Sequence, residues 1–176
     1  MKHKTLMIVE AGVLIALAQI LSYIKIYQSL YGGSVTAASM VPILIFALRW
    51  GARKGLMAGA VYGVLQFILG PKYSFHILSI ALDYVFAFGA LGLAGLFARR
   101  GLRGALMGTG AGISFRFLSH FLSGVVIFGM YAPEGMSPVV YSLIYQATYL
   151  LPELAITLLV IGLLYKPLWA VVEPSE

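Results

Sequence analysis

Five ionisable side chains interrupt long apolar runs of this sequence: Glu10, Asp83, Arg116, His120 and Glu153. A charge is costly to bury in apolar surroundings, so each of these groups needs either a partner or a function. Asp83 is the only charged side chain in its run, which favours a functional role for its carboxylate. His120 lies four residues before Gly124, where a ligand could approach the backbone closely.

Aromatic and amide side chains accompany these ionisable groups. Tyr141, Tyr145 and Tyr149 recur every four residues, a spacing that places side chains on one helix face, and Gln146 and Glu153 occupy adjoining positions. Tyr73, His76 and Tyr84 flank Asp83. This composition is typical of a pocket for a small, aromatic, cationic ligand. The carboxylate would supply the counter-charge, the rings would stack, and the amide would fix orientation by hydrogen bonding.

Structural interpretations of the same residues remain open. Tyrosines near helix ends, such as Tyr73 and Tyr131, are expected in the aromatic belt at a membrane interface. Arg116 and His120 are four residues apart and could form a structural network with Glu153 or Glu10. Glu10 is also close enough to the start of its run to reach the interface.

The elements that carry these residues are predicted to be transmembrane helices. Of the 176 residues, 61% are hydrophobic and 10% are charged, and the mean hydropathy is +0.95. These values exclude an ordinary soluble domain, a disordered chain and a large water-soluble catalytic domain. The apolar runs are continuous rather than alternating, which favours helices over barrel strands. We therefore predict an all-α integral membrane protein, with one membrane-embedded domain over residues 1–176. Its six helices cover approximately residues 5–26, 35–49, 54–70, 74–98, 104–131 and 138–166.

The distribution of lysine and arginine predicts the orientation of these helices. With six crossings, one side carries Lys2, Lys4, Arg49, Arg53, Lys54, Arg99, Arg100, Arg103 and Lys166, and the other carries Lys25 and Lys72. This asymmetry places both termini in the cytoplasm. Asp83 then lies about 13 Å below the outer end of its helix, at roughly 1.5 Å per residue. A cleavable signal peptide at the N-terminus is an alternative that Glu10 and the long apolar run disfavour.

Several functional classes lack their sequence signatures. The chain has no cysteine and contains no phosphate-binding loop, H-E-x-x-H zinc motif or G-x-S-x-G elbow. We expect no metal, no cofactor and no nucleic-acid partner, and we expect a binding or transport subunit rather than an enzyme. An intramembrane enzyme that uses Asp83 and His120 as an acid/base pair is the alternative. An outer pocket without an energy source indicates one part of a larger assembly.

Gly12 and Ala16 form a small-x-x-x-small pair in the first predicted helix. Such a pair lets another helix approach closely, either within the chain or from a partner.

The residues resemble the ThiT family, the thiamine-specific substrate-binding (S) components of energy-coupling factor transporters. The similarity spans nearly the whole chain and keeps the spacing between its blocks. The most specific blocks are YGGS at 31–34, PILIFALRWG at 42–51, LDY at 82–84, SHFLSG at 119–124, and YSL at 141–143 continuing to YQATY at 145–149.

The resemblance implies a thiamine pocket near the outer surface, formed by the last three helices and capped by the loop after the first. Asp83 matches an acidic position of the family that would serve the thiazolium charge or the aminopyrimidine. Matching binding positions are occupied by Tyr84, His120, Tyr141 and Tyr73, and Gly124 matches a close-approach glycine.

Three positions depart from the family pattern. Phe128 stands where some members have tryptophan, which keeps a stacking face. Gln146 replaces an asparagine and is one methylene longer. Gly33 stands where some members have a loop tryptophan, so stacking from that loop would be lost.

The resemblance also implies a transport mechanism in a prokaryotic plasma membrane. Thiamine would bind from outside, and the S component would dock through Gly12 and Ala16 on a transmembrane coupling subunit (EcfT-like) that carries two ATPases. ATP hydrolysis by these partners would tip the S component and deliver thiamine inward. The alternatives are an S component for another vitamin or a thiamine precursor, and a stand-alone facilitator.

Overall fold

A computed structural model describes residues 2–29 and 33–172, so Tyr31 and Gly32 of the YGGS block lie outside the described residues. The first helix, α1 (Lys2–Tyr23), leads into a short antiparallel hairpin of β1 (Lys25–Gln28) and β2 (Ser34–Thr36). The predicted all-α architecture is therefore incomplete, and the predicted helix 5–26 ends at Tyr23. Beyond it, the backbone groups of β1 pair with β2 instead of continuing the helix, with Tyr27 opposite Val35 and Gln28 opposite Ser34.

The second predicted helix is also corrected. Residues 34–36 form β2, and α2 (Val41–Trp50) starts six residues later than expected, after a left-handed residue at Ala38 (φ 59°). Ten residues span about 15 Å, half of a bilayer core. Nearly every side chain of α2 is buried, and its neighbours include α1, α3 (Ala52–Leu69) and α7 (Pro138–Val172). This run is apolar because it forms the protein core.

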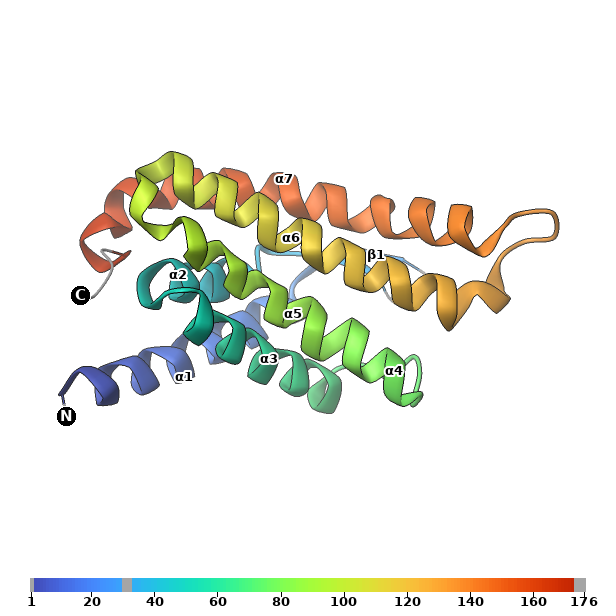
Figure 1. Ribbon diagram of the computed structural model, residues 1–176, viewed down its shortest axis with the longest axis horizontal. Helices are drawn as coiled ribbons and strands as arrows, with labels where there is room; N and C mark the ends of the chain where they lie inside the picture. The colour runs from blue at the N-terminus through green and yellow to red at the C-terminus, as the bar shows by residue number, and fades with distance from the viewer. Residues whose placement is uncertain (1, 30–32, 173–176) are drawn as a thin grey trace.

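The chain then forms two long antiparallel arms (Figure 1). The first arm contains α4 (Ile77–Ser79), a π-helical segment η1 (Ile80–Phe86), α5 (Ala87–Gly89) and a 3-10 segment η2 (Ala90–Arg100). It turns into α6 (Gly101–Val126) at Gly101, whose φ of 64° suits glycine. The predicted helix 104–131 thus stops at Val126, and η3 (Phe128–Tyr131) follows as a separate turn.

By length and apolar composition, three described helical stretches can cross a membrane: 3–23, 77–126 and 138–167. The middle stretch contains both antiparallel arms. Residues 2 and 172 lie toward the same end of the molecule, whereas α4 and the α6–α7 connection lie toward the other (Figure 1).

Close backbone contacts hold this first arm, from α4 to η2, against α3. A Cβ atom at Gly59 would lie 2.3 Å from the Phe88 carbonyl oxygen, and one at Gly63 would lie 2.2 Å from that of Tyr84. Larger residues would push the two helices apart. These glycines therefore fix the position of the segment that carries Asp83.

Candidate binding site

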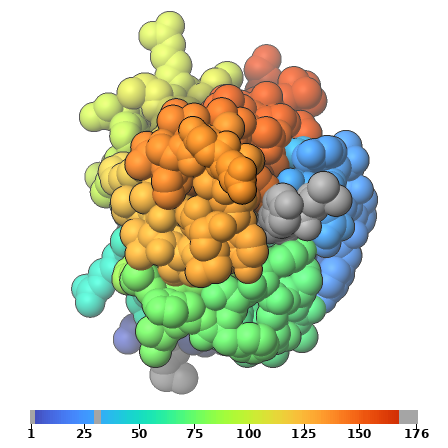
Figure 2. All heavy atoms as spheres, turned by 90° about the vertical axis from the view of Figure 1, so that its right-hand side faces the viewer, coloured from blue at the N-terminus to red at the C-terminus, as the bar shows by residue number. Residues whose placement is uncertain are grey.

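A cavity of about 390 Å³ opens between η1, α6, α7 and the hairpin. Figure 2 shows the corresponding end of the molecule, where the green segment around α4, the orange ends of α6 and α7 and the blue hairpin region meet. All eight predicted substrate-binding residues line this cavity: Tyr73, Asp83, Tyr84, His120, Gly124, Phe128, Tyr141 and Gln146. Residues separated by up to 73 positions in the sequence are therefore brought to one site.

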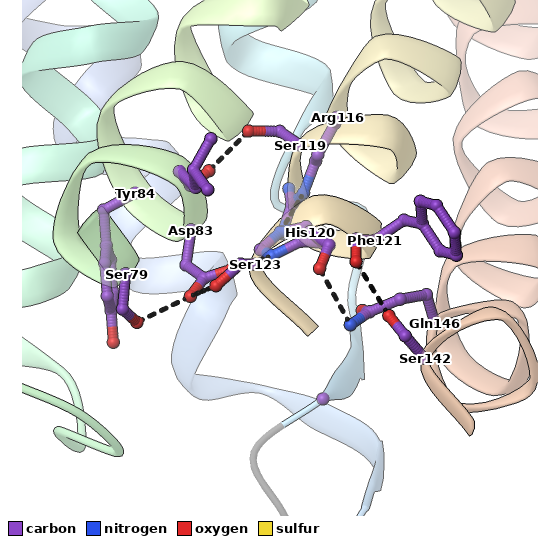
Figure 3. Close-up of polar contacts among 12 residues, drawn as sticks. Ser79, Asp83, Tyr84, Arg116, Ser119, His120, Phe121, Ser123, Ser142 and Gln146 are labelled. Carbon is purple, nitrogen blue, oxygen red and sulfur yellow. Dashed lines mark hydrogen bonds and ion pairs between the residues drawn. The ribbon is translucent and has the colours of Figure 1, made fainter. Parts of the chain in front are cut away.

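Asp83 is held from three sides (Figure 3). Its Oδ2 atom accepts hydrogen bonds from the Ser79 hydroxyl at 2.7 Å and from the Ser123 hydroxyl at 2.6 Å. Its Oδ1 atom lies 3.0 Å from Nδ1 of His120. The carboxylate thus has a fixed orientation at the cavity wall, and hydrogen-bond donors compensate for part of its burial.

His120 links Asp83 to Arg116, whose Nε lies 3.4 Å from Nε2 of the imidazole. The Arg116 guanidinium carbon also lies 4.1 Å from the centroid of the Phe88 ring, a cation–π distance. The suggested network of Arg116 and His120 with Glu153 or Glu10 takes a different form. Among the described residues, Arg49 and Glu10 form an ion pair, and His120 contacts Asp83 rather than either glutamate.

Glu10 has a structural role in this geometry. Its Oε2 atom accepts a hydrogen bond from Nε1 of Trp50 at 2.7 Å and lies 3.1 Å from Nε of Arg49. These contacts attach α1 to the end of α2. The carboxylate is therefore paired within the protein, away from the residues that line the cavity.

Gln146 is oriented by groups of the protein itself. Its Nε2 donates to the His120 carbonyl oxygen at 3.2 Å, and its Oε1 accepts from the Tyr149 hydroxyl. The nearby Ser142 hydroxyl donates to the Phe121 carbonyl at 2.9 Å (Figure 3). The amide therefore lines the cavity and also connects α6 to α7.

Aromatic rings form much of the remaining wall. Tyr141 and Tyr145 stack at 6.1 Å between centroids, and Tyr145 meets Tyr149 edge-on at 5.8 Å. Phe128 stacks with Tyr131 at 6.3 Å. The hydroxyl of Tyr84 lies 3.5 Å from the Pro71 carbonyl oxygen, and Tyr73 is 43% exposed.

Gly124 lines the cavity but is required first for helix packing. A Cβ atom there would lie 2.1 Å from Oγ of Ser142 and 3.2 Å from Nε2 of Gln146. Small size at this position lets α6 and α7 approach each other closely.

Four residues that support the site were missing from the prediction: Ser79, Thr36 and Gly33 line the cavity, and Ser123 contacts Asp83 without lining it. Ser79 and Ser123 hold Asp83, and Thr36 and Gly33 connect the hairpin to α7. Ser79 had a signal in the sequence, since it precedes Asp83 by one helical turn. A second polar group lies between α1 and α3, where Nε2 of Gln66 lies 2.8–2.9 Å from oxygen atoms of Gln19, Ser22 and Tyr62.

The hairpin reaches α7 at Gly33. Its backbone N–H donates to the Tyr145 hydroxyl oxygen at 2.8 Å, and a Cβ atom there would lie 2.3 Å from the Tyr149 ring. Aromatic rings from α7 thus occupy the space beside this glycine.

The predicted partner-docking pair lies outside the site. Gly12 and Ala16 are exposed on α1, and no atom lies within 4 Å of a Cβ atom built at Gly12. The pair is therefore not used for close packing within the described chain. Over residues 2–29 and 33–172, no group of three or more His, Cys, Asp or Glu side chains could hold a metal ion.

Comparisons with known proteins agree over nearly the full chain. The family model described as "Thiamine transporter protein (Thia_YuaJ)" matches residues 8–172. The thiamine transporter ThiT of Bacillus subtilis is 32% identical over 171 residues, which cover 90% of this chain and 89% of the relative. ThiT of Lacticaseibacillus paracasei is 32% identical over 179 residues, covering 93% and 89%. A solved structure of ThiT from Listeria monocytogenes has a TM-score of 0.86 at 22% identity, covers 98% of this chain and all of that one, and shows the shared fold.

Proposed function

Because this chain belongs to the thiamine transporter family and is a cell membrane protein, we propose that it is the thiamine-binding S component of an energy-coupling factor importer. The observation that carries the proposal is one oriented carboxylate, Asp83, in the wall of a cavity rich in aromatic rings. The cavity volume of about 390 Å³ falls in the range of small-molecule sites, roughly 300–1,000 Å³.

Thiamine combines a permanent positive charge with a flat aminopyrimidine, and the cavity offers a complement for each. Asp83 provides the negative charge that a buried cation requires. Tyr141 and Phe128 provide aromatic faces, and Tyr84 and Tyr73 provide further aromatic surface on the opposite wall. His120, Gly124 and Gln146 form the wall between them.

We further propose that the α1–α2 connection is the cap of this cavity. Gly33 and Thr36 line the cavity and are hydrogen-bonded to α7. Thiamine would enter when these contacts open and would be enclosed when they form. Occupancy shifts this equilibrium only if thiamine binds the closed arrangement more tightly.

The proposed orientation has six crossings with both termini in the cytoplasm. Two charge-rich connections support it. The α2–α3 turn, with Arg49, Arg53 and Lys54, and the η2–α6 turn, with Arg99 and Arg100, lie toward the opposite end of the molecule from the α3–α4 connection, which carries Lys72 (Figure 1). In this orientation the cavity opens to the outside. Because α2 is short, the second crossing consists of the hairpin strand and α2 together.

ATP-driven transport would require partners, because the sequence has no phosphate-binding loop. We propose an EcfT-like coupling subunit with two ATPases, docked through the exposed face of α1 that carries Gly12 and Ala16. Thiamine uptake by proteoliposomes that hold this chain alone, without ATP, would instead support a stand-alone facilitator.

Calorimetric titration of the purified, detergent-solubilised chain with thiamine tests the binding function. We expect saturable binding without ATP or partners, and a loss of more than about tenfold in affinity, or ~1.4 kcal/mol, for Asp83→Asn. Glu134→Gln is the matched control, because it removes the same charge from an exposed loop. An unchanged affinity in Asp83→Asn would overturn the counter-ion role. Folded protein that binds a related vitamin or precursor but no thiamine would reassign the substrate.

A further inference from the structure

We propose that Arg116 is a positioning residue that fixes the tautomer of His120, so that the imidazole carries its proton on Nδ1 and presents it to Asp83. The effect on ligand affinity rests on the proposed thiamine site, but the tautomer itself does not. Arg116 lines the cavity beside His120 and was not among the predicted binding residues.

The direction of each hydrogen bond follows from the chemistry of the donors. A guanidinium has five N–H donors and no acceptor, so Nε of Arg116 can only donate to Nε2 of His120, 3.4 Å away. Nε2 must therefore be the unprotonated nitrogen of the ring. In a neutral imidazole the proton then belongs to Nδ1, which lies 3.0 Å from Oδ1 of Asp83.

The same geometry disfavours a proton on both ring nitrogens. An imidazolium would direct its Nε2–H at the Nε–H of Arg116, and two donors would face each other. The charged and titratable groups around the ring are Asp83 from η1, Arg116 from α6 and Tyr149 from α7, whose ring lies 6.3 Å away. Only Asp83 among them can accept the ring proton at the observed contacts.

Arg116 is itself held in place for this role. Its guanidinium carbon lies 4.1 Å from the centre of the Phe88 ring, on the arm that also carries Asp83. Arg116 and His120 are one helical turn apart on α6. The two helices therefore present an ordered series of donors that ends at Oδ1 of Asp83.

The consequence for the site is a carboxylate whose hydrogen bonds are all oriented. Oδ1 receives the His120 proton, and Oδ2 receives the Ser79 and Ser123 hydroxyls. A fixed carboxylate loses less freedom when a cation binds, and preorganisation of this kind increases affinity.

Nitrogen-15 NMR of the imidazole ring tests the proposal directly, because the two neutral tautomers give different nitrogen shifts. A His3→Gln/His76→Gln background leaves His120 as the only histidine. In this background, without thiamine, we expect the Nδ1–H tautomer. If His120 has the Nε2–H tautomer in this background, with Asp83 and Arg116 intact, the proposal is overturned.

Two variants separate Arg116 from Asp83, since the carboxylate also favours a proton on Nδ1. In Asp83→Ala the arginine acts alone, and we expect the Nδ1–H tautomer to persist. In Asp83→Ala/Arg116→Met the preference should disappear. If Asp83→Ala alone already yields the Nε2–H form, Arg116 does not fix the tautomer.

Thiamine affinity supplies the functional measurement. Arg116→Met in the same background should weaken binding about fivefold, as expected for one lost hydrogen bond. Arg103→Met, which removes an exposed arginine, is the matched control. An Arg116→Met variant with unchanged thiamine affinity would overturn the positioning role. Failure of the unmodified chain to bind thiamine, with the tautomer as expected, would instead contradict the proposed ligand.

Discussion

Glu153 accepts two hydrogen bonds from Thr36, one from its backbone N–H at 2.7 Å and one from its hydroxyl at 2.6 Å. The carboxylate is 3% exposed and belongs to α7, whereas Thr36 ends the second strand of the hairpin. Hydrogen bonds to a buried carboxylate are stronger than those between neutral groups. This pair is therefore a principal attachment of the proposed cap to the helix bundle.

Loss of the Thr36 hydroxyl should loosen this attachment. We expect Thr36→Val to weaken thiamine affinity by about tenfold and to increase its dissociation rate, because one charge-assisted hydrogen bond contributes roughly 1.5–3 kcal/mol. Stopped-flow displacement of bound thiamine measures the rate. Thr148→Val is the matched control, since that exposed hydroxyl bonds only within α7. Equal dissociation rates for the two variants would exclude the attachment role.

The close contact at Gly33 predicts a second effect on the hairpin. A Cβ atom in Gly33→Ala would lie 2.3 Å from the Tyr149 ring, so either the hairpin or the ring must move. We expect thiamine affinity to fall by at least about tenfold, ~1.4 kcal/mol, measured by calorimetry. Gly110→Ala provides the control, because nothing lies within 4 Å of its Cβ position. A Gly33→Ala variant that binds as tightly as this control would contradict the closed geometry.

Packing at Gly124 predicts a substitution effect that a second change can relieve. Gly124→Ala places a Cβ atom 2.1 Å from Oγ of Ser142, so we expect lower thermal stability and weaker thiamine binding. Ser142→Gly removes the obstructing side chain and should restore part of the loss. A double-mutant cycle of melting temperatures measures the coupling. Additive effects of the two substitutions would show that this contact does not limit packing.

The exposed position of Gly12 predicts that a larger side chain there affects assembly and transport but not thiamine binding. Its exposed position on α1 has room for a larger side chain, so Gly12→Leu should leave thiamine affinity unchanged. Steric blockage of a helix that packs closely there should abolish assembly and uptake. Co-purification with the proposed coupling subunit and ATPases measures assembly, and Val13→Leu serves as the control on a neighbouring exposed position. Full assembly of Gly12→Leu would place docking elsewhere.

The cavity wall was accessible to sequence interpretation because its chemistry is unusual in an apolar chain. Asp83, His120 and Gln146 are polar groups in long apolar runs, and helical spacing brings each toward its neighbours. The eight predicted residues line one cavity, and they were identified from this pattern together with the family resemblance. Their individual contacts with thiamine stay predictions.

The hairpin and α2 could not be predicted in the same way. Lipid-facing and core-facing segments are both apolar, so composition alone made residues 35–49 resemble one continuous membrane helix. The strand at 34–36 is fixed by β1 and by Glu153, which is 117 residues from Thr36. A contact of that separation leaves no local periodicity. The Ser123 hydroxyl was not predicted either, because serine is common in helices that pack closely.

The β1–β2 hairpin is small, so its local stability differs from that of the helices. Two short strands are marginally stable by themselves, and every residue of β1 is exposed. We therefore expect the hairpin to open locally at lower free energy than the helices and to exchange its amide hydrogens before they do. The observed affinity for thiamine is the intrinsic affinity multiplied by the fraction of molecules in which the hairpin is folded. Sequence changes in this hairpin can therefore change the observed affinity without altering the cavity wall.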